Sequence, residues 1–216
     1  RAGDRVMLLL DNSPAFVVCW FACARIHAVA VDTNTNYTAD ELAHAMSLSR
    51  PLGVVTSAAL RPRLDEVLRD EWVVITDERT ATVPDLHGDA VELPKADADP
   101  AAPLCIQFTS GTTSRPKAVL YSHANALWAG KVGAAHGDVR ADDVFLVYMP
   151  LFHTAALMWH FLPTMWAGGT VVLMPRYSAS QFWDVSVRNR CTQTMLLGIT
   201  KTTLDAQPVP DHSYRI

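Results

Sequence analysis

The first part of the chain alternates short apolar runs with stretches whose apolar residues recur at helical spacing. Continuous apolar runs of this length predict buried strands, here at residues 6–10, 29–31, 52–56 and 72–76. The stretches between them predict helices at residues 15–27, 38–49 and 60–69. Such alternation predicts a mostly parallel sheet with helices on both faces.

Capping residues mark the start of two of these helices. Ser13 offers an N-cap before residues 15–27, and Pro14 takes the favoured first helical position. Thr38 and Glu41 have the spacing of a capping box. Pro51 ends the second helix, because the residue before a proline is disfavoured in the helical conformation.

The same alternation returns in the second half of the chain. Strands are predicted at residues 104–106, 143–149, 170–174 and 194–197. We expect Ser122 to cap a helix that runs to about Ala135, and Thr154 to cap a helix that ends at Gly168. Ser178 and Gln181 form a second capping-box pattern before a helix that ends at Arg190, and a last short helix follows residue 197.

Between these halves, periodic spacing is lost. Proline, alanine and aspartate dominate residues 84–103, which is typical of a surface loop or a boundary. We therefore expect an α/β fold of two lobes with mostly parallel sheets. The expected division is a first lobe at 1–84, a linker or surface loop at 85–103, and a second lobe at 104–216.

One segment concentrates polar chemistry, the run Phe108-Thr-Ser-Gly-Thr-Thr-Ser-Arg-Pro-Lys117, directly after the strand at 104–106. A strand that leads into a flexible turn rich in hydrogen-bond donors is a common way to hold a phosphate group. Glycine allows the backbone to approach closely, hydroxyls donate hydrogen bonds, and lysine adds charge. The residues that offer these groups are Thr109, Ser110, Gly111, Thr112, Thr113 and Lys117. A solvated turn without a ligand is the alternative interpretation.

The Walker phosphate loop is the nearest other motif, and it does not fit. Counted from Gly111, Pro116 stands at the position of the second glycine and Ala118 at the position of the magnesium-binding hydroxyl. Proline has no N–H to donate to a phosphate, and it cannot adopt a positive φ.

The run instead closely resembles the T-S-G-T-T-G-x-P-K signature of the adenylate-forming superfamily, which includes acyl-CoA synthetases, adenylation domains and luciferases. Ser114 stands where that signature has glycine. The resemblance implies that the six residues listed above bind the phosphates of ATP. It covers essentially the whole chain, but only the first part of the family's large amino-terminal domain, so the second lobe is expected to be incomplete at its carboxyl end.

A second motif, Tyr148-Met-Pro-Leu-Phe-His153, resembles a short P-L-F-H segment of the same superfamily. The resemblance implies that His153 lies near the substrate carboxylate and orients it or balances its charge. A strand-end histidine satisfied by the backbone is the alternative. A group of large side chains follows this motif: Trp159, Phe161, Met165 and Trp166. We expect them to pack in the core. The more specific alternative is that they form a wall of the acyl pocket.

Together the motifs resemble an ATP-dependent acid–thiol ligase, which joins a carboxylic acid to ATP as an acyl-adenylate and then transfers the acyl group to coenzyme A. The resemblance implies Mg²⁺ that arrives with ATP, rather than a metal bound by the protein. Two other functions remain open. One is an adenylation domain that loads an amino or aryl acid onto a carrier protein. The other is a nucleotide-binding module without chemistry, which is considered because Ser114 replaces the glycine of the signature.

Composition narrows the classes of partner. A net charge of −4 without a basic cluster argues against a nucleic-acid binder. The longest apolar stretch, 15–24, is too short to span a bilayer, and the chain opens without an apolar leader. The four cysteines have no metal or redox spacing. We therefore expect reduced thiols, a cytoplasmic location and no transmembrane segment.

Overall fold

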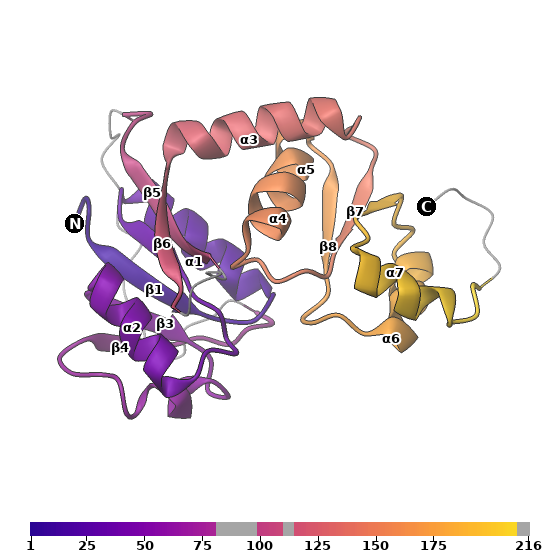
Figure 1. The fold of residues 1–216 in the computed structure, drawn as a ribbon. Helices are drawn as coiled ribbons and strands as arrows, with labels where there is room; N and C mark the ends of the chain where they lie inside the picture. Colours follow the sequence, from indigo (N-terminus) through magenta and orange to yellow (C-terminus); the bar gives the residue numbers. More distant parts are fainter. Residues whose placement is uncertain (81–98, 110–114, 211–216) are drawn as a thin grey trace. The chain divides into compact units, whose positions relative to one another are not determined.

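The structure is a computed structural model that describes residues 1–80, 99–109 and 115–210 (Figure 1). The chain forms two compact units, Arg1–Asn125 and Ala126–Ile216. The sequence analysis instead divides the chain within 85–103. The difference arises because the two strands that follow this segment join the sheet of the first unit.

Six strands form the sheet of the first unit, in the order β4-β3-β1-β2-β5-β6. All neighbours pair in parallel except β5 and β6, which pair antiparallel. The predicted α/β fold with a mostly parallel sheet is confirmed. The strands are β1 (Arg5–Leu9), β2 (Val29–Asp32), β3 (Gly53–Thr56), β4 (Trp72–Ile75), β5 (Pro103–Thr109) and β6 (Lys117–Ser122).

Two α-helices of this unit begin at the capping residues that the sequence predicts. They are α1 (Pro14–Arg25) and α2 (Ala39–Ser49). The Ser13 hydroxyl accepts a hydrogen bond from the Phe16 N–H at 3.2 Å. Thr38 and Glu41 form a complete capping box, in which each side chain accepts from the backbone N–H of the other. These contacts satisfy backbone donors that a helix start leaves unpaired.

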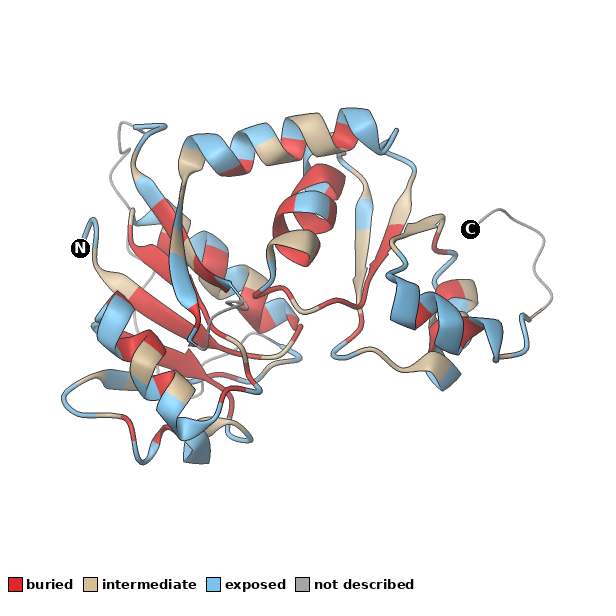
Figure 2. Ribbon diagram, in the orientation of Figure 1, coloured by how far each residue is buried: buried red, intermediate tan, exposed pale blue. Residues whose placement is uncertain are grey.

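The apolar core beneath α2 joins the helix to the sheet (Figure 2). It includes Met7, Leu9, Val31, Leu42 and Phe108. Burial of an apolar side chain of this size contributes about 1.5–3 kcal/mol relative to an exposed position.

Close packing between two neighbouring strands requires a glycine in β3. A Cβ atom at Gly53 would lie 2.0 Å from Cδ2 of Trp72 in β4. Gly53 and Trp72 occupy paired positions of the parallel ladder. The indole therefore covers the space that a side chain at Gly53 would fill.

The second unit contains a parallel three-stranded sheet with the order β8-β7-β9. Its elements are β7 (Val144–Val147), α4 (Thr154–Ala156), the π-helix η2 (Leu157–Phe161), α5 (Leu162–Ala167), β8 (Thr170–Leu173), α6 (Ala179–Arg188), β9 (Gln193–Thr194) and α7 (Gly198–Asp205). The segment from α4 to α5 and the pair α6–α7 lie on opposite sides of this sheet (Figure 1).

Helix α3 (His123–His136) continues from β6 into the second unit. The Ser122 hydroxyl accepts from the Asn125 N–H at 3.2 Å, as expected of a cap. Glycines then allow α3 to approach α5 closely, because a Cβ at Gly133 would lie 2.5 Å from Cγ of Pro163. Gly168 ends α5 with φ of 79°, a conformation that favours glycine.

The structure differs from the sequence analysis at two places in the first unit. The helix predicted at 60–69 is only a short 3₁₀ helix, η1 (Arg61–Leu64). The predicted inner residues Leu64 and Val67 are both buried, but Val67 lies in a turn after η1, where its N–H donates to the Leu64 carbonyl at 3.0 Å. Turns with hydrogen bonds of this spacing bring residues three apart onto one face, as an α-helix does. The sequence analysis also omits β6. This edge strand is only partly buried, and it is held by antiparallel pairing with β5.

The second unit corrects three further predictions. Thr154 is the first residue of α4 and not its cap, because the N-cap is His153. The Ser178 hydroxyl contacts the Ser180 hydroxyl at 3.3 Å and makes no capping hydrogen bond to the backbone of α6. The strand predicted at 194–197 shares only Thr194 with β9, because the Leu197 N–H donates to Thr200 Oγ1 at the start of α7.

Candidate functional site

The β5–β6 hairpin carries the ends of the predicted phosphate loop. Thr109 is the last residue of β5 and Lys117 the first of β6, and the two are paired across the antiparallel ladder. Both are exposed. Paired positions of this kind have Cβ atoms roughly 4.5–5.5 Å apart, so a hydroxyl and an ammonium group lie close together at the paired ends of β5 and β6. The other predicted residues, Ser110, Gly111, Thr112 and Thr113, lie outside the described residues, as does Ser114.

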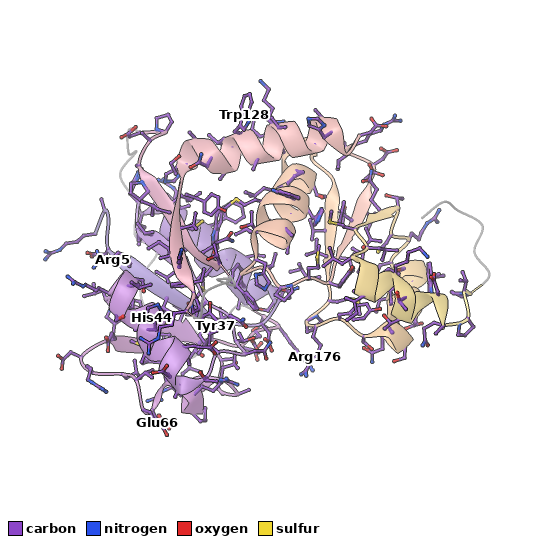
Figure 3. The ribbon with its side chains drawn as sticks, viewed as in Figure 1. Arg5, Tyr37, His44, Glu66, Trp128 and Arg176 are labelled. Carbon is purple, nitrogen blue, oxygen red and sulfur yellow. The ribbon has the colours of Figure 1, made fainter. Side chains whose placement is uncertain are left out.

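Helix α2 holds the start of β6. This helix carries His44 (Figure 3). The His44 ring contacts the Pro116 carbonyl through Nε2 at 3.1 Å. A carbonyl oxygen only accepts hydrogen bonds, so Nε2 carries the proton in this contact. An exposed ion pair of 3.4 Å joins Arg115 to Asp40. The His44 contact is the stronger constraint, because exposed ion pairs contribute about 0–1 kcal/mol.

The last apolar residue of β5 anchors the other side of the hairpin. Phe108 is 7% exposed, and its ring meets that of Tyr37 edge-on with centroids 6.2 Å apart. Side chains alternate along a strand, so burial of Phe108 directs Thr109 to the opposite face. The core therefore fixes the direction in which the chain leaves β5.

His153 lies in the second unit, at the turn where β7 leads into α4. It is the N-cap of α4, with φ −99° and ψ 142°, and its carbonyl accepts hydrogen bonds from the N–H groups of Ala156 and Leu157. Its ring lies against that of Phe152 with centroids 4.6 Å apart. His153 is an exposed residue, yet partial desolvation lowers the pKa of its ring below the usual 6.5. The neutral imidazole therefore predominates at pH 7 and offers one N–H donor.

The helical segment after His153 contains a π-helix, which the sequence analysis misses. In η2, the N–H of Leu162 donates to the Leu157 carbonyl five residues earlier. His160 of this turn is 7% exposed, and its ring stacks on Phe145 of β7 with centroids 5.1 Å apart and planes 17° apart. Its Nε2 lies 2.9 Å from the Met195 sulfur. Burial lowers the pKa of His160 to about 4, so the ring is neutral.

The aromatic residues around His160 divide between core and surface. Phe161 is buried, as core packing predicts, whereas Trp159, Met165 and Trp166 are exposed within the described structure at 59%, 48% and 51%. Their role as an acyl-pocket wall stays a prediction.

Comparison with known proteins identifies the family. The model of the AMP-binding enzyme family matches residues 1–200. This chain belongs to the AMP-binding enzyme family.

The curated relatives of this AMP-binding enzyme are CoA ligases with longer chains. The crotonobetaine/carnitine–CoA ligase of Salmonella typhimurium is 35% identical over 221 residues, which cover 96% of this chain and 43% of the relative. The same ligase from Shigella sonnei is also 35% identical, with the same shares covered. The chain thus spans less than half the length of these curated relatives.

Solved structures agree in fold. ATP-bound MatB from Rhodopseudomonas palustris is 25% identical with a TM-score of 0.83, and the match covers 96% of this chain and 42% of that one. The inhibitor-bound amino-terminal domain of FACL13 from Mycobacterium tuberculosis is 29% identical with a TM-score of 0.80, and the match covers 96% and 53%. The similarity to adenylate-forming enzymes that the two motifs indicate is therefore confirmed.

A buried polar pair in the AMP-binding fold also escapes the sequence analysis. Asp32 ends β2, and its carboxylate accepts a hydrogen bond of 3.2 Å from the Gln107 amide of β5. Both side chains are at most 2% exposed. Burial raises the pKa of Asp32 well above 3.8 and outweighs the opposing hydrogen bonds. An aspartate inside the apolar run Val29-Ala-Val-Asp32 is the feature of the sequence that indicates it.

Two searches of the described residues bear on metals and membranes. No group of three or more His, Cys, Asp or Glu side chains in the described ranges is arranged to hold a metal ion. Within the same ranges, none of the helices has the length and apolar character needed to cross a membrane.

Proposed function

We propose that this chain is the amino-terminal part of an ATP-dependent acid–thiol ligase. In the first step of this reaction, a carboxylate oxygen attacks the α-phosphorus of ATP, so that an acyl-adenylate forms and pyrophosphate leaves. In the second step, the thiol of coenzyme A attacks the acyl carbon, the acyl–oxygen bond breaks, and acyl-CoA and AMP are released. Membership of the AMP-binding family and relatives named as CoA ligases support this proposal.

The β5–β6 hairpin is the observation that carries the proposal. Its strands hold Thr109 and Lys117, two residues of the matched motif, at paired positions. In this function, hydroxyls and backbone amides of Ser110, Gly111, Thr112 and Thr113 bind the phosphates, together with Thr109 and Lys117. Hydrogen bonds to such charged groups contribute about 1.5–3 kcal/mol each.

His153 is proposed to contact the substrate carboxylate. A neutral ring donates one hydrogen bond to an anion and adds no charge of its own. The lowered pKa of His153 supports this form at pH 7. In that form, the ring orients the carboxylate without an ion pair that would weaken its attack on ATP.

Mg²⁺ is proposed to accompany ATP. The candidate residues of the described structure, Thr109, Lys117 and His153, include no carboxylate, which fits a magnesium ion held mainly by phosphate oxygens and water. Bound Mg²⁺ would neutralise part of the phosphate charge.

The cytoplasm is the proposed location of the protein. The four cysteines are unpaired in the structure, which supports a reducing compartment.

ATP–pyrophosphate exchange by the longer parent protein tests the proposal. Panels of small aliphatic, fatty, aryl and amino acids identify the acid class, and transfer to coenzyme A is measured separately. We expect acid-dependent exchange followed by acyl-CoA formation. Exchange without acyl-CoA formation, but with loading of a carrier protein, would contradict the thiol ligase. ATP binding without exchange for any acid would point to a module without chemistry.

A further inference from the structure

One side chain of α2 reaches the residue that precedes Lys117. The ring of His44 lies with Nε2 3.1 Å from the Pro116 carbonyl. Pro116 is buried, whereas Lys117 is exposed. A backbone carbonyl that is withdrawn from water needs a hydrogen-bond donor, and the His44 N–H supplies one. The contact therefore ties α2 to the start of β6.

Helix α2 is itself held at its start and along its inner face. The capping box of Thr38 and Glu41 fixes the first turn. Leu42 and Ala45 are at most 1% exposed and belong to the core beneath the helix. The helix also packs against β6. It is therefore a rigid support for a hydrogen bond from His44.

The same core holds the other strand of the hairpin. Phe108 of β5 is buried in it, and Thr109 follows Phe108 at the end of the strand. Thr109 in turn pairs with Lys117 across the ladder. One helix thus positions both strands, β5 through the core around Phe108 and β6 through the hydrogen bond from His44.

A second contact reaches the same part of the hairpin from the same face of α2. Asp40 lies four residues before His44, and residues four apart are neighbours on a helix surface. The Asp40 carboxylate forms the exposed ion pair with Arg115, the residue before Pro116. Exposed ion pairs contribute little to stability. The partly buried hydrogen bond from His44 is therefore the contact that fixes this end of β6.

We propose that His44 is a positioning residue of the nucleotide site. Through the Pro116 carbonyl it holds the start of β6, and thereby holds Lys117 where the phosphates of ATP bind. His44 touches neither ATP nor the acid in this role and acts through Lys117. The inference rests on the proposed function, which assigns Lys117 to the phosphates. It adds a residue that lies 72 positions from Pro116 in the chain and outside both motifs.

Calorimetric titration of the longer parent protein with ATP tests the proposal. His44→Ala should weaken ATP binding by about two- to tenfold, the range expected for the loss of one hydrogen bond. In pyrophosphate exchange, the KM for ATP should rise by a similar factor, while the KM for the acid stays unchanged. Equal ATP affinity of the parent and the His44→Ala variant would overturn the proposal.

Two further substitutions separate the hydrogen bond from packing. His44→Gln keeps an N–H donor and should restore most of the affinity for ATP. His44→Phe keeps a ring without a donor, and it should bind ATP as weakly as His44→Ala. Restoration by phenylalanine but not by glutamine would assign the effect to packing and refute the role of the donor.

A double-mutant cycle tests whether His44 acts through Lys117. If it does, His44→Ala should cost no further ATP affinity in a Lys117→Ala background. Additive losses would contradict this route. Unchanged affinity in Lys117→Ala would refute the proposed phosphate site, and this inference with it. A loss in Lys117→Ala with none in His44→Ala would refute this inference alone.

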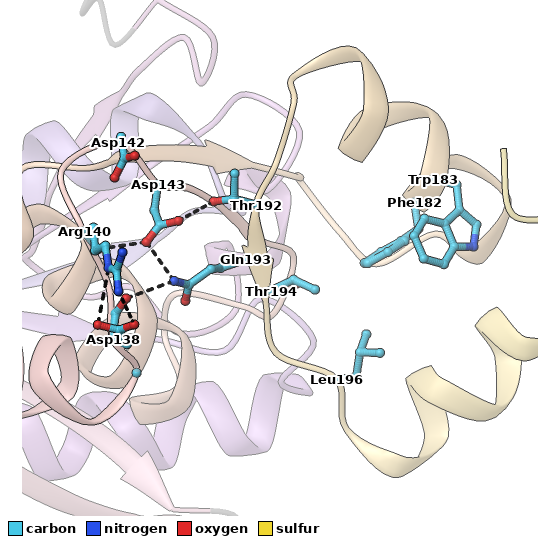
Figure 4. Close-up of a pocket in the computed structure, with 11 residues that line it drawn as sticks. Asp138, Arg140, Asp142, Asp143, Phe182, Trp183, Thr192, Gln193, Thr194 and Leu196 are labelled. Atoms are coloured by element: carbon cyan, nitrogen blue, oxygen red, sulfur yellow. Dashed lines mark hydrogen bonds and ion pairs between the residues drawn. The ribbon is translucent and has the colours of Figure 1, made fainter. Parts of the chain in front are cut away.

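A hydrogen bond in the second unit provides the control for lost stability alone. Gln193 lines a cavity of about 790 Å³ there, and its Nε2 donates to the Asp143 carboxylate at 2.8 Å (Figure 4). Asp143 also accepts from Thr192 Oγ1 at 2.7 Å, so it keeps a partner when Gln193 is replaced. Gln193→Ala should lower the unfolding midpoint and leave the affinity for ATP unchanged. An equal loss of affinity in Gln193→Ala and His44→Ala would attribute the effect to stability and overturn the positioning role.

Discussion

Gln107 of β5 donates a hydrogen bond of 3.2 Å to the buried carboxyl group of Asp32 in the neighbouring strand β2. One buried acidic group thus lies where β2 pairs with β5, the first strand of the hairpin. Its main effect on the free energy of unfolding comes from desolvation, because burial raises the pKa of Asp32 well above 3.8.

Replacement of Asp32 by asparagine should stabilise the protein near neutral pH. The unfolded chain releases the Asp32 proton near pH 3.8, whereas the folded chain keeps it to higher pH, so folding stability falls as pH rises through this window. The amide of the asparagine variant cannot ionise, so the folding stability of the variant does not fall with pH in this way. The gain of Asp32→Asn should be near zero below pH 4 and grow with pH, by about 1.4 kcal/mol for each unit of pKa shift. Urea unfolding at pH 4 and pH 7 measures it.

Asp77→Asn is the control of opposite sign. Hydrogen bonds from Thr80 lower the pKa of the exposed Asp77 carboxyl, so its contribution is present above pH 3.8 and is lost on acidification. A gain from Asp32→Asn that does not change with pH would contradict the assignment of a raised pKa.

Gly53→Ala should destabilise the first unit by about 1–3 kcal/mol, the usual cost of overpacking. The added methyl would lie 2.0 Å from the Trp72 ring. Gly198→Ala is the matched control, because nothing lies within 4 Å of the Cβ position there and its φ is not positive. Thermal unfolding of the two variants checks the difference. Restoration of stability by Trp72→Val in the Gly53→Ala background would identify the indole as the cause.

Lys117→Ala in the longer parent should weaken ATP binding by roughly tenfold to a hundredfold, the equivalent of about 1.5–3 kcal/mol for a charge-assisted contact. Lys117 is exposed, so its replacement should leave the unfolding midpoint unchanged. Lys131→Ala, an exposed lysine of α3, is the charge-matched control. Calorimetric titration with ATP measures the affinities. Equal affinity of the parent and the Lys117 variant would remove Lys117 from the phosphate site.

His153 should act as a neutral donor. Because its pKa is lowered from 6.5 by desolvation, the acid limb that it contributes to the pH profile of pyrophosphate exchange should have a midpoint below pH 6.5. His153→Ala in the parent should abolish that limb and lower exchange, while His153→Gln, which keeps an N–H donor, should restore part of the rate without the limb. An unchanged pH profile in His153→Ala would show that the ring does not meet the substrate.

The sequence predicts the interior strands well because burial on both faces makes them continuous apolar runs, as in residues 6–10. Residues 117–122 also contain a short apolar run, at 118–121, but their strand is not buried on both faces. It lies at the edge of the sheet and pairs only with β5 within the described residues. The capping box of Thr38 and Glu41 forms as predicted, whereas the Ser178 hydroxyl contacts the Ser180 hydroxyl instead of the helix backbone. A cap depends on the side-chain rotamer, and neighbouring hydroxyls can favour a different one.

The candidate site is predictable only in part for a similar reason. Motif spacing identifies Thr109, Lys117 and His153, which lie at the ends of strands or helices, where polar residues interrupt apolar runs. His160 has no such marker. Its neutral, buried state follows from the stack on Phe145 and the contact with Met195, which are distant in sequence.

The π-helix Leu157–Phe161 holds one residue more than an α-helical turn would. Deletion of a single residue from it would leave an α turn, so His153 and α5 would keep their relative orientation. The side chains within the turn would instead shift by one position, and His160 would lose its place on the Phe145 ring. Natural shortening at this one place would therefore change the buried contacts of the turn while its two ends stay where they are.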